Sequence, residues 1–198
     1  MRHCVAACLK NVVVVGIIST VSFSSMVGAE SYIHVSDSVL ELNGGKEYQI
    51  KAAILFNVLK FTDWPAANAP SESLVVGIVG KDPFGGMIDK VFSGKKKGKS
   101  SIVIKRYPSL TGLTDSDLGE IHAVFVTDGE IKGIGEMRAK LESAGILIIG
   151  ESDGSAANGH VAIPVKKGKV KIQVNKGLLE AAGFKMKSKL LQSAEIVK

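Results

Sequence analysis

The sequence predicts an α/β domain of three layers, in which helices flank both faces of a mostly parallel sheet and a C-terminal β-hairpin follows. Short apolar runs rich in β-branched residues are typical of buried strands, and four occur at residues 74–80, 101–105, 121–126 and 146–149. Helical segments separate the first run from the second and the third from the fourth. This order favours a parallel sheet that is covered on both faces.

The first helix is expected over residues 46–64, because apolar side chains from Ile50 onward recur at near-helical spacing. Pro65 is expected to stop it. A second helix is expected to begin directly after the first strand, where Asp82 would be the N-cap and Pro83 the first helical residue.

Three connecting segments follow the second helix: one before the second strand, one between the second and third strands, and one between the third and fourth. Residues 94–99 are rich in lysine and glycine and predict an exposed turn, and residues 107–119 predict further turns. Apolar residues at helical spacing predict an amphipathic helix over residues 131–141, ended near Gly145.

The C-terminal part predicts a hairpin followed by two helices. Residues 161–165 and 169–174 are two strand-like runs joined by a glycine turn. Asn175 can cap a helix that Gly183 would close. A last helix is expected over residues 190–197.

Residues 1–29 have the pattern of a secretory signal peptide. Arg2 and Lys10 supply a positive start, residues 12–18 form a short apolar run, and small residues end at Ala29. The run is too short to span a bilayer, which takes about 20 apolar residues. We expect cleavage after Ala29 and export to the periplasm, with an uncleaved membrane anchor as the alternative.

The rest of the chain predicts one domain. Residues 30–45 are expected to form a loosely held N-terminal arm, and residues 46–198 an α/β domain without repeat or linker. Cys4 and Cys8 lie in the leader, so the exported chain has no disulfide and no thiolate nucleophile. Its charge, about +4 without the leader's two bases, is too modest to indicate nucleic-acid binding.

No motif predicts a metal, a cofactor or catalysis. His34, His122 and His160 are scattered, whereas a zinc site needs three or four converging ligands. The glycines of residues 77–86 do not match a dinucleotide motif, and Asp82 places a carboxylate where phosphate would bind.

A serine-based triad is also not indicated, because Ser152, Asp153 and His160 lack a nucleophile elbow. The sequence therefore predicts a protein that is not an enzyme and binds no cofactor.

The predicted contact surface joins apolar side chains at the end of the first helix to a basic run. Phe61 and Trp64 are the apolar candidates, although core packing also explains Phe61. Lys95, Lys96 and Lys97 would form the rim. The lysine run can be interpreted in two ways. It is either a solvated loop, or a contact for an anionic partner such as lipid head groups or an acidic protein face.

Several motifs resemble the YfiR family of periplasmic proteins. Residues 51–65, KAAILFNVLKFTDWP, are similar to the family's opening helix, and GKDPFG at 80–85 to its strand-to-helix turn. The ending is also similar, with KVKIQVN at 169–175, AAGF at 181–184 and SKLL at 188–191. The resemblance covers about residues 46–196.

The resemblance implies a repressor that binds the periplasmic domain of a membrane-bound diguanylate cyclase and keeps the cyclase inactive. An outer-membrane lipoprotein would sequester the repressor, so that cyclic-di-GMP and biofilm formation rise. The family also implies a homodimer. The alternative function is a periplasmic small-molecule binding protein, with its ligand at the carboxyl ends of the parallel strands beside residues 80–86 and Asp128.

Overall fold

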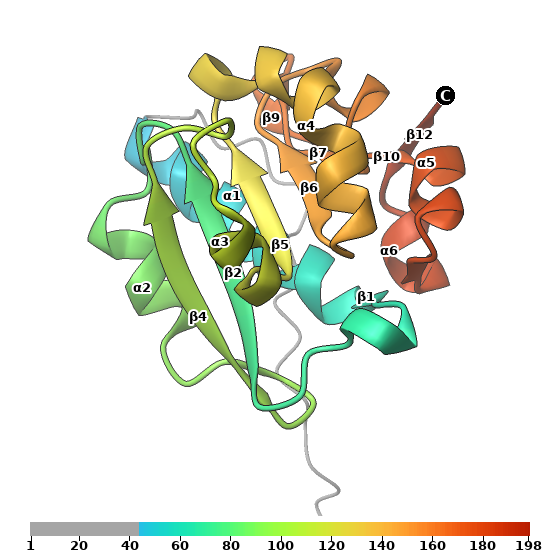
Figure 1. Ribbon diagram of the computed structural model, residues 1–198. Coiled ribbons are helices and arrows are strands. Elements are labelled where there is room, and N and C mark those ends of the chain that lie inside the picture. The colour runs from blue at the N-terminus through green and yellow to red at the C-terminus, as the bar shows by residue number, and fades with distance from the viewer. Residues whose placement is uncertain (1–43) are drawn as a thin grey trace, which may run out of the picture. The chain divides into compact units, whose positions relative to one another are not determined.

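The computed structural model describes residues 44–198, in which a central sheet has helices on both faces (Figure 1). The strands of this sheet are β2 (Ser73–Val79), β3 (Lys96–Lys97), β4 (Ser100–Tyr107), β5 (Ala123–Val126), β6 (Leu147–Gly150), β7 (Val161–Ala162), β10 (Gln173–Asn175) and β12 (Glu195–Val197). Their order across the sheet is β12-β10-β7-β6-β5-β2-β4-β3. The described helices are α1 (Gly44–Phe61), α2 (Gly86–Phe92), α3 (Asp115–Glu120), α4 (Lys132–Ser143), α5 (Lys176–Ala181) and α6 (Ser188–Leu191).

Most strands pair in parallel, as the sequence predicts. Strand β2 lies between β4 and β5, and the parallel ladder continues through β6 to β7. The antiparallel pairs are β3 with β4 and β7 with β10, while β12 runs parallel to β10. The predicted mostly parallel sheet is confirmed.

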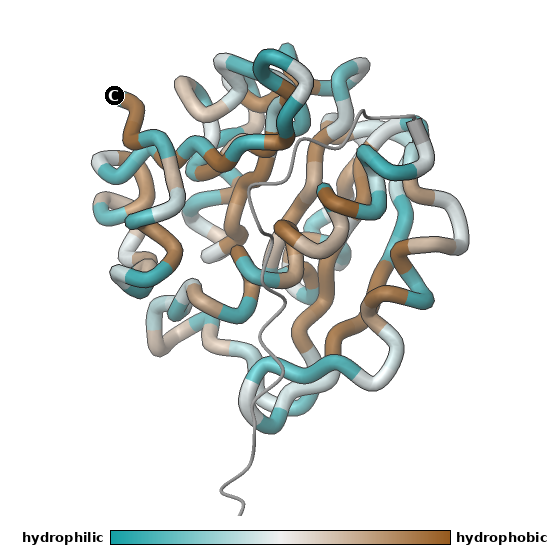
Figure 2. Tube along the Cα trace, turned by 180° about the vertical axis from the view of Figure 1, so that it is seen from behind, coloured by the Kyte–Doolittle hydropathy of each residue, from teal (hydrophilic) through white to brown (hydrophobic). Residues whose placement is uncertain are grey.

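Alternate residues of each central strand enter two separate cores. In β2, Leu74 and Ile78 join the core formed with α1, α2, α5 and α6, whereas Val75 and Val79 join the core formed with α3 and α4. Because successive side chains point to opposite faces, a strand covered on both sides must be apolar throughout. Figure 2 shows this as hydrophobic colour along the central strands. The three-layer prediction is therefore confirmed.

Helix α1 differs from its prediction at both ends. It ends at Phe61, and Thr62–Asp63 form the short strand β1, which pairs antiparallel with β11 (Lys185–Met186). At the other end the helix already includes Gly44 and Gly45, although the sequence places both in the loosely held N-terminal arm. The partner strand β11 lies more than 120 residues away, so helical periodicity could not reveal where α1 stops.

The turn after β2 differs too. Both Phe84 and Gly85 donate their backbone N–H to Oδ1 of Asp82, and the positive φ of Gly85, 52°, interrupts the chain before α2 begins at Gly86. Asp82 therefore caps a turn and not a helix.

Two short elements arise where the sequence predicts only turns. Helix α3 begins after Thr114, which forms a reciprocal capping box with Asp117. Lys96–Lys97 form β3 against the start of β4. Both elements are stabilised by contacts that composition alone does not show.

The C-terminal hairpin is present but smaller than predicted. Strands β8 (Val165–Lys166) and β9 (Lys169–Val170) pair around a two-residue turn, while β7 and β10 join the main sheet. Asn175 caps α5 as expected, since its Oδ1 accepts the N–H of Leu178. The predicted last helix ends at Leu191, and the chain then forms β12.

The predicted signal peptide, residues 1–29, and residues 30–43 of the predicted arm lie outside the described residues. Within residues 44–198, none of the helices has the length and apolar character needed to cross a bilayer.

His160 is a buried histidine whose surroundings favour its neutral form. Its side chain is fully buried, and Nδ1 accepts the backbone N–H of Ile148 at 2.9 Å. Nε2 lies 3.5 Å from Oε1 of Glu142, and neither atom has a hydrogen bond. Burial, reinforced by the positive charge of Arg138, lowers the pKa of His160 to about 4.

Acid is therefore expected to destabilise the fold through His160. The unfolded histidine titrates near pH 6.5, so the stabilisation is complete above that pH and is lost as the pH falls toward 4, by up to about 3 kcal/mol. Replacing His160 by Asn, whose Oδ1 can still accept the Ile148 N–H, should reduce this loss. Urea unfolding at pH 7.5 and pH 4.5 measures it; equal losses in both proteins would contradict the assignment.

Candidate functional site

The two predicted apolar contacts lie at the end of α1 but differ in exposure. Phe61 is partly exposed, whereas Trp64 is only 8% exposed. The Trp64 ring packs edge-on against Phe184 at 6.0 Å, and its Nε1 donates to the carbonyl of His122 at 2.9 Å. Trp64 therefore belongs to the core, and Phe61 is the apolar side chain that reaches the surface.

The three predicted lysines lie beside this helix end. Lys97 Nζ lies 4.9 Å above the Trp64 ring and donates a hydrogen bond to the carbonyl of Thr62. Lys95 Nζ lies 5.5 Å from the ring of Phe56, and Lys96 is exposed. The structure thus brings all five predicted residues to one region.

The same region contains three lysines that sequence reasoning missed, and two of them come from the C-terminal part of the chain. In the β1–β11 pair, Lys185 lies opposite Asp63, and the N–H of Lys187 donates to the carbonyl of Phe61 at 2.9 Å. Lys185 and Lys187 are both exposed. Their alternation in the sequence is a weak signal for a strand, but nothing in it indicates that they meet residues 60–64.

We call this region the basic surface. Its members are Lys60, Phe61, Lys95, Lys96, Lys97, Lys185 and Lys187. In the three segments that form it, residues 60–64, 95–97 and 185–187, the one acidic residue is Asp63.

The electrostatics of Lys97 reflect this concentration of charge. Partial burial lowers its pKa, Asp63 at 3.4 Å acts in the opposite direction, and the positive charge of Lys187 lowers the pKa further. A surface with this excess of positive charge favours an acidic partner and accelerates its association.

The carboxyl ends of the parallel strands, where the sequence places a ligand in the alternative hypothesis, are filled by the chain's own groups. Glu130 accepts the backbone N–H of Leu110 at 2.9 Å, and a Cβ on Gly80 would lie 2.2 Å from Oγ1 of Thr127. Asp82 pairs with Arg106 at 2.7 Å.

A buried ion pair closes the same end of the sheet beneath α1. Lys51 and Glu151 are 3% and 5% exposed, and Lys51 Nζ lies 2.9 Å from Glu151 and 2.7 Å from Glu47. The second carboxylate oxygen of Glu151 accepts the backbone N–H of Asp128. Burial and the hydrogen bond to Glu151 raise the pKa of Tyr48. The charged groups at this end of the sheet are therefore paired within the chain.

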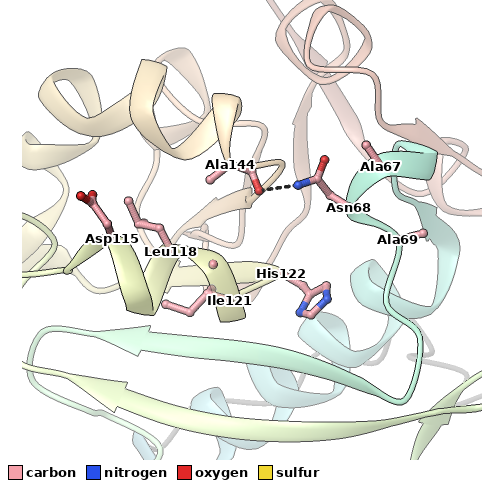
Figure 3. Close-up of a pocket in the computed structure, with 9 residues that line it drawn as sticks. Ala67, Asn68, Ala69, Asp115, Leu118, Ile121, His122 and Ala144 are labelled. Carbon is pink, nitrogen blue, oxygen red and sulfur yellow. Dashed lines mark hydrogen bonds between the residues drawn. The ribbon is translucent and has the colours of Figure 1, made fainter.

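A pocket of about 490 Å³ lies at the opposite, amino end of the strands (Figure 3). Its lining consists of Ala67, Asn68, Ala69, Asp115, Leu118, Gly119, Ile121, His122 and Ala144. Asn68 donates to the carbonyl of Ala144 at 2.9 Å, and His122 accepts the N–H of Val75 at 3.2 Å. Burial lowers the pKa of His122, which favours its neutral form.

The comparisons with known proteins concern the whole domain. Residues 48–195 match the family described as YfiR/HmsC-like. The chain belongs to this family. A comparison with curated protein sequences found no significant match.

Solved structures similar to this YfiR/HmsC-like chain support the fold alone. An ABC domain in complex with L-Trp from Streptococcus pneumonia has a TM-score of 0.53 and 12% identity, over 72% of this chain and 59% of that one. A conserved domain protein from Vibrio cholerae has a TM-score of 0.52 and 11% identity, over 76% and 60%. This chain thus spans about three fifths of each of these proteins.

Residues considered for catalysis do not assemble. Ser152 donates to the carboxylate of Asp128, and Asp153 accepts from Gln173 and pairs with Lys166. His160 is buried against Ile148 and Glu142. Within residues 44–198, no three His, Cys, Asp or Glu side chains lie close enough to hold a metal ion.

The Lys51–Glu151 pair predicts a specific stability response. Replacing Lys51 by Met leaves two acids beside Tyr48 without their cation and should cost about 3–5 kcal/mol. Replacing Glu151 by Gln in the same chain should recover part of that loss, because one buried negative charge is removed. A double-mutant cycle by urea unfolding measures the coupling. Additive effects of the two substitutions would contradict the pairing.

Proposed function

We propose that this protein is a periplasmic regulator that binds the periplasmic part of an inner-membrane diguanylate cyclase and inhibits it. Cyclic-di-GMP and biofilm formation would then be limited while the complex persists. The observation on which the proposal rests is the YfiR/HmsC-like match, which extends over residues 48–195. The signal-peptide pattern of residues 1–29 agrees with action outside the inner membrane.

The basic surface is the proposed contact for the cyclase. Its lysines lie in α1, in or directly before β3, and in or directly after β11, so one face would present several positive charges to an acidic patch on the partner. Such charges mainly increase the association rate, whereas a partly exposed aromatic side chain such as Phe61 contributes to affinity once it is covered. An outer-membrane lipoprotein that covers the same surface would release the cyclase.

Inhibition by covering a surface of the cyclase is consistent with the chemistry of the described residues. The carboxylates at the carboxyl end of the sheet are paired with Arg106, Lys51 and backbone N–H groups, so they serve the fold. We propose that the protein acts by changing which surface of the cyclase is free, without making or breaking bonds.

Deletion of the gene should raise the cellular cyclic-di-GMP concentration, and expression of the wild-type protein should return it to the level of the parent strain. The double variant Lys96→Glu/Lys187→Glu should leave the cyclic-di-GMP concentration high, because two charges of the basic surface are reversed. Nucleotide measured by mass spectrometry in cell extracts is the readout. The double variant Lys81→Glu/Lys132→Glu is the matched control, since both lysines are exposed and lie outside the basic surface.

A binding measurement with purified proteins tests the proposed contact surface independently of the cyclic-di-GMP level in cells. The purified periplasmic domain of the cyclase should bind the Lys96→Glu/Lys187→Glu variant about tenfold more weakly than wild type at low salt, with a smaller difference at high salt. Equal cyclic-di-GMP in the deletion strain and its parent would overturn the function. Normal repression by the double variant would overturn only the proposed surface.

A second candidate function, binding of a small periplasmic molecule, is favoured by the pocket at the amino end of the strands. Its volume of about 490 Å³ lies within the usual range for ligand sites. Native mass spectrometry of protein purified from periplasm should then show a retained mass. That mass should disappear after Ala69→Trp, which fills the pocket. Absence of any added mass in the wild-type protein would argue against this candidate.

A further inference from the structure

A chain of ring contacts connects the interior of the protein to the basic surface. The imidazole of His160 lies 5.1 Å from the ring of Phe184, and Phe184 packs edge-on against Trp64 at 6.0 Å. Lys97 lies above that Trp64 ring, and Lys185 follows Phe184 directly in the sequence. Because a close-packed interior transmits strain, a displaced imidazole would disturb lysines of the basic surface through two ring contacts.

His160 is held in place by a bond that only its neutral form can make. Its Nδ1 accepts the backbone N–H of Ile148 at 2.9 Å. A proton on Nδ1 would set two N–H groups against each other, so this bond would be lost and the ring would have to move. The backbone carbonyl of His160 accepts the N–H of Asn175 and is not affected by the proton. Protonation therefore acts on the side chain and leaves the strand pairing intact.

The charged groups that face this imidazole both come from α4. Its Nε2 lies 3.5 Å from Oε1 of Glu142, and Arg138 lies 3.8 Å from the same oxygen. The contacts from β6, β10 and the residues before β11 come from Ile148, Asn175 and Phe184, which are uncharged. Because Arg138 already accompanies the carboxylate, Glu142 is a poor counter-ion for an imidazolium, and the pKa of the histidine lies at about 4.

We propose that His160 is an acid switch for the basic surface. When the ring is protonated it leaves its place beside Phe184, the contact between Phe184 and Trp64 loosens, and the lysines of residues 95–97 and 185–187 lose their fixed arrangement. The switch goes beyond the proposed function and rests on it only for its consequence, the release of the cyclase in acid.

The size of the effect follows from the two states of the histidine. His160 titrates near pH 6.5 when it is solvated and at about 4 when it is buried. The opened state therefore binds the proton more tightly. Its population relative to the closed state should rise about 30-fold between pH 7.5 and pH 5.

The single tryptophan of the chain reports the switch directly. In NMR spectra of the wild-type protein, the indole N–H signal of Trp64 and a ring-carbon signal of His160 should shift with the same midpoint, between pH 4 and pH 6.5. Far-ultraviolet circular dichroism should stay constant over that range. His160→Asn should abolish the Trp64 shift. His122→Asn is the matched control and should retain it, since His122 is the other histidine of residues 44–198 and its carbonyl accepts the Trp64 N–H.

Different midpoints for the two wild-type signals, an unchanged Trp64 shift in His160→Asn, or a loss of circular dichroism at the same pH would overturn the switch. The first of these results does not depend on whether a variant folds.

The consequence for binding is measured separately with the purified periplasmic domain of the cyclase. Wild type should bind it more weakly at pH 5 than at pH 7.5, by up to about 30-fold, and His160→Asn should lose much less. Absence of binding at pH 7.5 would overturn the proposed function, while the NMR result still decides the switch. Equal weakening of both proteins would overturn the role of His160.

Discussion

The short antiparallel pairing of β1 with β11 is the constraint on which the candidate surface depends. It stops α1 at Phe61 and fixes the segment after α5 against the segment after α1. Trp64 strengthens the junction from inside, since its ring packs on Phe184 while its N–H satisfies the His122 carbonyl. The lysines of β3 and those of residues 185–187 become neighbours only because of this junction. A surface of this kind is a product of tertiary structure, and its charge density cannot be obtained from any one segment of the chain.

The sequence predicted the central sheet well because burial on both faces leaves a strong local signal. Strands β2, β5 and β6 are apolar runs with almost no polar interruption, and each is found within two residues of its predicted bounds. Helix α4 was equally predictable from the sequence, since Ile134 and Leu141 recur on one side of it. Elements that depend on partners distant in the sequence could not be predicted. β1, β11 and β12 have two or three residues each, which is too short for a periodicity to emerge.

The candidate site was predicted in part, for the same physical reason. A run of lysines and an aromatic helix end are visible in the sequence, so Phe61 and Lys95–Lys97 could be proposed together. The burial of Trp64 and the arrival of Lys185 and Lys187 depend on packing that involves residues more than 100 positions away. Asp82 is an intermediate case. Its capping chemistry was foreseeable, but the positive φ of Gly85 delays the helix that it was expected to begin.

The last three strand residues have a consequence for how the chain end is treated. β12 lies beside β10 as the outermost strand, and Lys198 follows it directly (Figure 1). Removal of residues 195–197 would therefore break hydrogen-bonded backbone and would uncover β10. An affinity tag fused at this terminus would extend from the sheet margin itself. A handle for purification is better attached elsewhere, or separated by a linker long enough to leave Ile196 and Val197 in register.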